Sequence, residues 1–105
     1  MTFNSQAANL MILGDSLSAG YQMPIEDSWP ELLNKQWQKT GQHAIINVSI
    51  SGETTDGGAR RIRPLLTNHK PDVVLIELGA NDGLRGFSPK QTKQNLNDII
   101  KAVTA

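Results

Sequence analysis

A serine that could act as a nucleophile follows the first apolar run of the chain. The run ends at Gly14, and Asp15 and Ser16 come directly after it. If a helix begins here, its backbone N–H groups and its dipole favour negative charge beside Ser16, where the oxyanion of an acyl-transfer reaction would form. The same residues fit a simpler interpretation, in which Ser16 or Asp15 only caps the following turn. Ser16 therefore needs partners before it can be assigned chemistry.

Two further loops carry groups that could act with Ser16. Gly52 offers a backbone N–H that a substrate can approach closely because no side chain shields it, and Asn81 offers a side-chain amide. Two such donors and a hydroxyl around one carbonyl form an arrangement for acyl transfer. Taken separately, Gly52 also fits a turn glycine, and residues 81–83 also fit an ordinary turn after a strand.

Two acidic residues, Asp15 and Asp82, lie beside these candidates. Paired acids can indicate a metal site, but no cluster of His or Cys accompanies them. We therefore interpret Asp15 and Asp82 as supporting residues, whose carboxylates brace the loops through hydrogen bonds. The sequence predicts no metal and no cofactor.

Three strand–helix units position these loops. Each unit is an apolar run, a glycine-bearing loop and an amphipathic helix, and the runs at 10–13, 44–50 and 72–78 predict strands. Strands that alternate with helices predict right-handed crossovers and an open parallel sheet with helices on both faces. Ligands bind such sheets beyond the carboxyl ends of the strands. The loops at 14–20, 51–58 and 79–87 all follow such ends, so we expect them to meet at one site.

Start signals mark the helices. Ser28 and Glu31 have the spacing of a capping box, and Ser88 with Gln91 repeats it around a proline at the first helical position. The middle helix is predicted from 55 to about 68, although it contains two glycines and a proline. Apolar residues recur at helical spacing in each: Trp29, Leu32, Leu33 and Trp37; Ala59, Ile62 and Leu66; Leu96, Ile99, Ile100 and Val103.

Length and charge exclude several classes of function. A chain of 105 residues predicts a single domain over 1–105, with 1–9 as a flexible N-terminal segment. Ten basic residues balance ten acidic ones, so no global field attracts nucleic acid, and we expect no nucleic-acid partner. The apolar runs are far shorter than the roughly 20 residues that span a bilayer, and residues 1–9 lack the pattern of a secretory signal.

Three motifs together resemble a known family. In order and spacing, GDSLS at 14–18, the glycine of SISGET at 49–54 and LGAND at 78–82 resemble the first three sequence blocks of the SGNH hydrolases, also called the GDSL esterase family. The resemblance implies a flavodoxin-like α/β/α sandwich with strand order 2-1-3 and a periplasmic or secreted location. It also implies that Ser16 is the nucleophile, that the N–H groups of Ser16 and Gly52 with the Asn81 side chain form the oxyanion hole, and that the loop at 83–87 helps to shape the acyl site.

The fourth block of the family, Asp-x-x-His, does not occur in this sequence. His43 and His69 precede predicted strands, so a five-residue strand separates either one from Ser16 by roughly 17 Å. A general base needs a reach of about 3 Å, so neither histidine fits that role. We expect the N-terminal part of a hydrolase of esters and thioesters, of the esterase, thioesterase or lysophospholipase type, that is C-terminally truncated and inactive alone. The alternatives are a non-catalytic module that binds acyl groups or esters and an assembly domain.

The strand predicted at 72–78 is expected at an edge of the sheet. It is apolar nearly throughout, and Glu77 is its only charge after Asp72. An edge of this kind offers unpaired N–H and C=O groups to another chain. We therefore predict that it pairs with a second copy or with the missing C-terminal portion.

Overall fold

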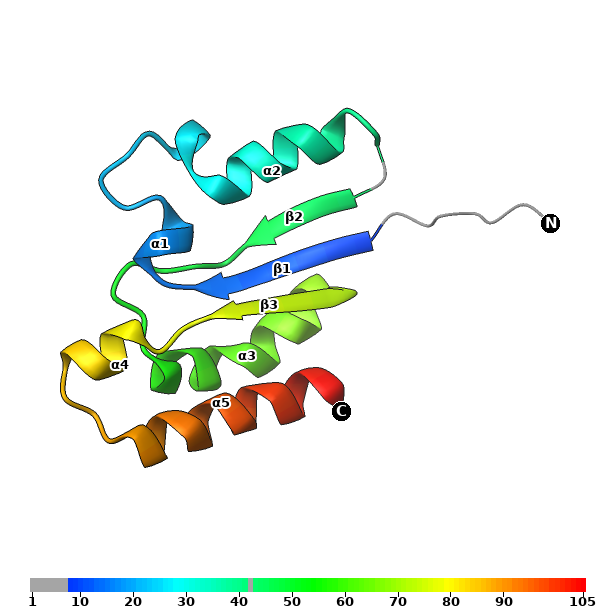
Figure 1. Ribbon diagram of the computed structural model, residues 1–105. Helices are drawn as coiled ribbons and strands as arrows, with labels where there is room; N and C mark the ends of the chain where they lie inside the picture. Colours follow the sequence, from blue (N-terminus) through cyan, green and yellow to red (C-terminus); the bar gives the residue numbers. More distant parts are fainter. Residues whose placement is uncertain (1–7, 42) are drawn as a thin grey trace.

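Three parallel strands form the centre of the computed structural model, which describes residues 8–41 and 43–105 (Figure 1). Strands and helices alternate along the chain, as the sequence predicts. The elements are β1 (Ala8–Gly14), α1 (Ser16–Ala19), the 3-10 turn η1 (Ile25–Asp27), α2 (Trp29–Gln38), β2 (His43–Asn47), α3 (Thr55–His69), β3 (Val73–Glu77), α4 (Ala80–Leu84) and α5 (Pro89–Thr104).

The sheet has the order β2-β1-β3, which confirms the predicted topology. Leu10 of β1 lies opposite both Ile45 of β2 and Val73 of β3, and both pairings are parallel. Helix α2 covers one side of the sheet, and α3 and α5 cover the other (Figure 1). The result is the expected three-layer arrangement, in which the loops after β1, β2 and β3 lie at the same end of the sheet.

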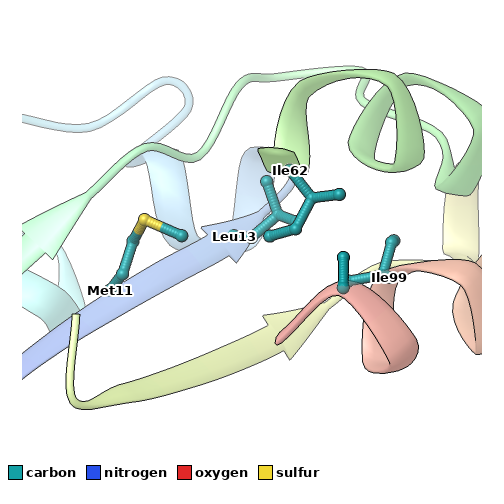
Figure 2. Close-up of a cluster of buried hydrophobic side chains, with 5 residues drawn as sticks. Met11, Leu13, Ile62 and Ile99 are labelled. Atoms are coloured by element: carbon teal, nitrogen blue, oxygen red, sulfur yellow. The ribbon is translucent and has the colours of Figure 1, made fainter. Parts of the chain in front are cut away.

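The main core lies between β1 and the α3–α5 layer (Figure 2). Met11 and Leu13 are two residues apart, so they point from one face of β1 toward Ile62 of α3 and Ile99 of α5. These side chains are fully or almost fully buried, and each contributes about 1.5–3 kcal/mol relative to an exposed position. Gly58 lets α3 lie close to these core side chains, because a Cβ at residue 58 would lie 2.6 Å from Cδ1 of Leu78.

The buried face of α5 differs from the predicted stripe. Ile99 is buried as expected, but Ile100 is 48% exposed, and Asn95 and Ala102 complete the buried face instead. Because α3 is the layer partner of α5, the residues that face α3 are the ones that lose water. Asn95 tolerates burial since its Nδ2 donates to Oγ1 of Thr55 at 3.1 Å.

Two strand boundaries differ from the prediction by two residues or more, and the others differ by one. β1 begins at Ala8, two residues before the predicted start at 10, and residues 1–7 of the predicted flexible segment lie outside the described part of the chain. Asn9 is fixed because its N–H donates to Oδ2 of Asp72 at 2.7 Å. β2 ends at Asn47 rather than at 50, although the N–H groups of Val48 and Ile50 still donate to the carbonyls of Ile12 and Gly14 in β1.

The two predicted capping boxes have different outcomes. Ser88 caps α5, since its side chain accepts from the N–H of Gln91 at 3.2 Å. Ser28 occupies the cap position of α2, but its hydroxyl donates backward to the carbonyl of Ile25 at 2.6 Å and closes η1. The prediction for Ser28 is therefore wrong, because the preceding 3-10 turn competes for the same hydroxyl.

β3 has one unpaired edge, and the side chains on one of its faces are partly exposed. β3 pairs with β1 and with no other strand among the residues described. Its side chains alternate, so Val73 and Leu75 point to the face opposite α3, where they are 55% and 42% exposed.

The helices within 8–41 and 43–105 include none with the length and apolar character that a membrane span requires.

Candidate active site

Ser16 is the first residue of α1, directly after the carboxyl end of β1. Asp15, rather than Ser16, is the cap of this helix. Its Oδ1 accepts from the N–H of Leu17 at 3.0 Å, and its carbonyl accepts from the N–H of Ala19 at 2.9 Å. The Ser16 hydroxyl makes no hydrogen bond to another described residue, so capping does not occupy it.

Gly52 lies in the turn between β2 and α3. Its φ of +82° is in the left-handed region, where glycine avoids the strain that a side chain would cause. The turn is held by Arg61 of α3, whose guanidinium donates to Oε2 of Glu53 at 2.7 Å and to the carbonyl of Val48 at 2.8 Å. Gly52 is thus a turn glycine, as one interpretation of the sequence has it, and the next helix fixes the position of its turn.

Asn81 lies in the first turn of α4, which follows β3. Its Nδ2 donates to the carbonyl of Glu53 at 2.9 Å and so joins the third loop to the second. An amide nitrogen carries two hydrogens, so one remains for a ligand after this bond forms. The predicted turn at 81–83 is therefore a short helix whose asparagine is oriented by the neighbouring loop.

The three candidate residues line one cavity of about 350 Å³ at the carboxyl end of the sheet. Ser16, Gly52 and Asn81 come from three loops, which are adjacent in Figure 1 near α1 and α4. Tyr21 and Ser51 complete the lining and were not singled out by sequence reasoning. Both lie within a few residues of a candidate, which is the only sequence signal that marks them.

Asp82 is 2% exposed and ties the site to two helices. Its carboxylate accepts from the N–H of Thr55 at 2.8 Å, from the Thr55 hydroxyl at 2.5 Å and from the Thr92 hydroxyl at 3.0 Å. Burial acts to raise the pKa of Asp82, but the hydrogen bonds from Thr55 and Thr92 outweigh it, so the pKa lies below its ordinary value. Among the described residues, no group of three His, Cys, Asp or Glu could hold a metal ion.

Both histidines lie at the far end of the sheet from Ser16. His43 is the first residue of β2, where its Nδ1 accepts from the N–H of Ala8 at 3.4 Å. His69 ends α3, just before the connection to β3. The seven residues of β1 separate Ala8 from Gly14, which corresponds to about 20 Å. Neither imidazole can reach the Ser16 hydroxyl in this fold.

A second and larger cavity lies beside α5. It has a volume of about 500 Å³, and its lining includes Gly83, Phe87, Leu96 and Ile100. The loop at 83–87, which the family resemblance links to an acyl site, thus lines this cavity and not the one around Ser16. The two cavities are neighbours, because Gly79 and Gly83 in the lining flank Asn81 on either side.

Comparisons with known proteins find similar proteins over almost the whole of this chain. A profile of the GDSL-like lipase/acylhydrolase family matches residues 12–105. The chain is similar to an arylesterase of Vibrio mimicus, 58% identical over 101 residues that cover 94% of this chain and 50% of that protein. It is also similar to thioesterase 1/protease 1/lysophospholipase L1 of Escherichia coli K12, 52% identical with 100% of this chain and 50% of that protein covered.

Solved structures give the same result. The psychrotrophic esterase EstA from Pseudoalteromonas sp., in a crystal structure inhibited by monoethylphosphonate, superposes with a TM-score of 0.86 at 46% sequence identity. The match covers 90% of this chain and 52% of that esterase. The chain therefore spans about half the length of the relatives that it matches.

Proposed function

This chain belongs to the GDSL-like lipase/acylhydrolase family, and we propose that it carries the nucleophile and the oxyanion hole of a serine hydrolase of carboxylic esters and thioesters. One observation supports this most directly: Ser16, Gly52 and Asn81 line a single cavity although they come from three separate loops. The names of the relatives, an arylesterase and a thioesterase/lysophospholipase, support acyl esters and thioesters as the substrate class. We treat residues 1–105 as one folding unit of this hydrolase.

The proposed reaction begins with attack by Oγ of Ser16 on the substrate carbonyl carbon, while the carbonyl π electrons move onto oxygen. The N–H groups of Ser16 and Gly52 and the free amide hydrogen of Asn81 stabilise this oxyanion. Collapse of the intermediate expels the alcohol or thiol, which takes up the proton that a base removed from Ser16. The acyl group stays on Ser16 until water, deprotonated by the same base, releases the acid.

The base must come from outside this sequence. His43 and His69 lie at the wrong end of the sheet, and the family resemblance assigns the role to an Asp-x-x-His block that the 105 residues do not contain. Under this proposal, the full site includes further polypeptide that supplies the base. The resemblance also supports a periplasmic or secreted location, which cell fractionation of the natural host would test.

The experiment is to join residues 1–105 to the part of the Vibrio mimicus arylesterase that this chain does not match. We expect hydrolysis of a short p-nitrophenyl ester that disappears in Ser16→Ala. Ser49→Ala is the matched control, because Ser49 lies outside the cavity lining and its hydroxyl makes only a long 3.4 Å bond to the Ile12 carbonyl. A folded chimera without esterase activity that still binds the ester would instead favour the non-catalytic binding module.

A further inference from the structure

A carboxylate on the edge strand accepts hydrogen bonds from residues on both sides of Ser16. Glu77, the last residue of β3, lies opposite Gly14 in the β1–β3 register. Its Oε1 accepts from the Ser18 hydroxyl at 2.8 Å and from the N–H of Asp15 at 3.3 Å. These two contacts bracket Ser16 in sequence, one residue before it and two after it.

Ser18 connects this carboxylate to two further elements. Its buried hydroxyl also accepts from Nε1 of Trp29 in α2 at 3.2 Å. Its backbone carbonyl accepts from Nδ2 of Asn47, the last residue of β2, at 2.8 Å. The side chains therefore form a relay from Trp29 through Ser18 to Glu77, and α1 is tied through Ser18 to β2, β3 and α2. A helix of only four residues has little stability of its own, so its orientation depends on such contacts.

Gly14 provides a second and independent observation. Its φ is not in the left-handed region, so glycine is not needed there for backbone conformation. A Cβ at this position would lie 2.9 Å from Oε1 of Glu77 and 2.9 Å from Oγ of Ser18. Glycine is needed at residue 14 because the hydrogen-bonded side chains of Ser18 and Glu77 occupy the space that a Cβ would fill. The glycine of the GDSLS motif is thus explained by the space that Ser18 and Glu77 occupy, and Glu77 is 63 positions away in the sequence.

We propose that Glu77 is a positioning residue for Ser16: through Ser18 and the Asp15 N–H, its carboxylate holds α1 in the orientation that presents the Ser16 hydroxyl to the cavity. The role in turnover rests on the proposed function, whereas the positioning of α1 does not. Glu77 touches no reacting atom and acts only through α1.

The charge around Glu77 fits a positioning role better than a stabilising one. No Lys or Arg forms an ion pair with Glu77 among the described residues. Asp15 is the titratable group that faces it, and burial first, then the Asp15 side chain, raise the pKa of Glu77 above 4.5. An ionised carboxylate without a cation costs stability, and the hydrogen bonds from Ser18 and Asp15 offset that cost.

The two tryptophans allow a direct test on the 105-residue chain. In a spectrum of ¹⁵N-labelled indole groups, we expect the Trp29 Nε1–H resonance to shift with a midpoint above pH 4.5, as Glu77 loses its proton. The step should vanish in Glu77→Gln and in Ser18→Ala, whereas the Trp37 resonance should keep its own profile in both variants. A Trp29 resonance with the same titration in Glu77→Gln would overturn the relay.

Amide exchange then measures the position of α1 itself. Glu77→Ala removes the acceptor of two hydrogen bonds, so we expect exchange at Ser18 and Ala19 to become about 10- to 100-fold faster, with Glu77→Gln close to the wild type. Gly14→Ala should behave like Glu77→Ala. Gly83→Ala is the matched control, because a Cβ there meets nothing within 4 Å. Unchanged exchange in Glu77→Ala, at unchanged global stability, would refute positioning.

The chimera with the Vibrio mimicus arylesterase tests how Glu77 affects the rate of ester hydrolysis. Glu77→Ala should lower kcat by about tenfold or more with KM nearly unchanged, and Glu77→Gln should restore most of it. A rise in KM with constant kcat, or a loss that Gln does not rescue, would contradict the proposal. If the chimera has no activity in any version, the proposed function fails, and the indole and exchange measurements still decide the role of Glu77.

Discussion

Replacement of Asp82 tests whether the third loop is held by a buried carboxylate. In Asp82→Ala, the N–H and hydroxyl of Thr55 and the hydroxyl of Thr92 lose their acceptor together. A hydrogen bond to an ionised group contributes about 1.5–3 kcal/mol, and bonds to one carboxylate are not additive. We therefore expect a loss of about 3–4 kcal/mol in the free energy of unfolding, much of it from the buried donors left unpaired.

The lowered pKa of Asp82 also predicts how the free energy of unfolding changes with pH. Because folding lowers the pKa of Asp82 below its ordinary value of 3.8, the stabilisation is present above that pH and is lost as the pH falls through the folded value. Urea unfolding, followed by circular dichroism at pH 7 and in steps down to about pH 2, measures both the loss and its acid limb. Asp82→Asn, which keeps one acceptor oxygen and carries no charge, should lose less stability and lack this limb.

Asp98→Ala is the control for this experiment. Asp98 lies on the exposed surface of α5, where its Oδ1 accepts from the Gln94 side chain at 3.0 Å. Its loss should change the free energy of unfolding by less than about 0.5 kcal/mol. An Asp82→Ala protein that is within about 1 kcal/mol of the wild type, with the same pH profile, would refute the assignment of Asp82 as the brace of the site.

Three further predictions concern the site and the edge of the sheet. The 105-residue chain alone should hydrolyse a short p-nitrophenyl ester no more than about 10³–10⁴-fold faster than water does, since the base is absent; turnover typical of an intact esterase, abolished in Ser16→Ala, would contradict this. In the active chimera, Asn81→Ala should lower kcat about 10²–10³-fold with the fold retained, as circular dichroism would show, and a matching loss of fold would reduce Asn81 to a structural residue. The chain alone should dimerise through β3 because Val73 and Leu75 are exposed on an unpaired edge; light scattering across dilution and amide exchange at 73–77 measure this, and a stable monomer whose β3 amides exchange freely would contradict it.

The architecture and the meeting of the three loops could be predicted from the sequence. Continuous apolar runs and apolar residues at a spacing of 3.6 predict the type and order of the elements, and connectivity then limits a βα repeat to a parallel sheet. Ser16, Gly52 and Asn81 could be chosen because each follows the carboxyl end of a strand, and such ends share one edge of a sheet. Their convergence needed no knowledge of any individual side-chain contact.

The partners of individual polar groups could not be predicted in the same way. Ser28 has the spacing of a cap, yet its hydroxyl closes the preceding turn, and Asp15 rather than Ser16 caps α1. Both outcomes depend on which of several nearby acceptors or donors a short side chain meets, and local spacing leaves more than one available. Propensity also counts a glycine inside α3 as a cost, whereas Gly58 is required because Leu78 and Ile99 fill the space of a side chain.

The sequence by itself determined the alternation of elements, the parallel sheet and the set of loops that form the site, because hydrophobic period and chain connectivity are local properties. Only the tertiary structure decided why Gly14 must lack a side chain and what holds Ser18. The answer is Glu77, which is 59 residues from Ser18 in the sequence and 2.8 Å from its hydroxyl in space. A contact of this kind exists only once β3 has paired with β1 in a fixed register, so no pattern within either segment encodes it.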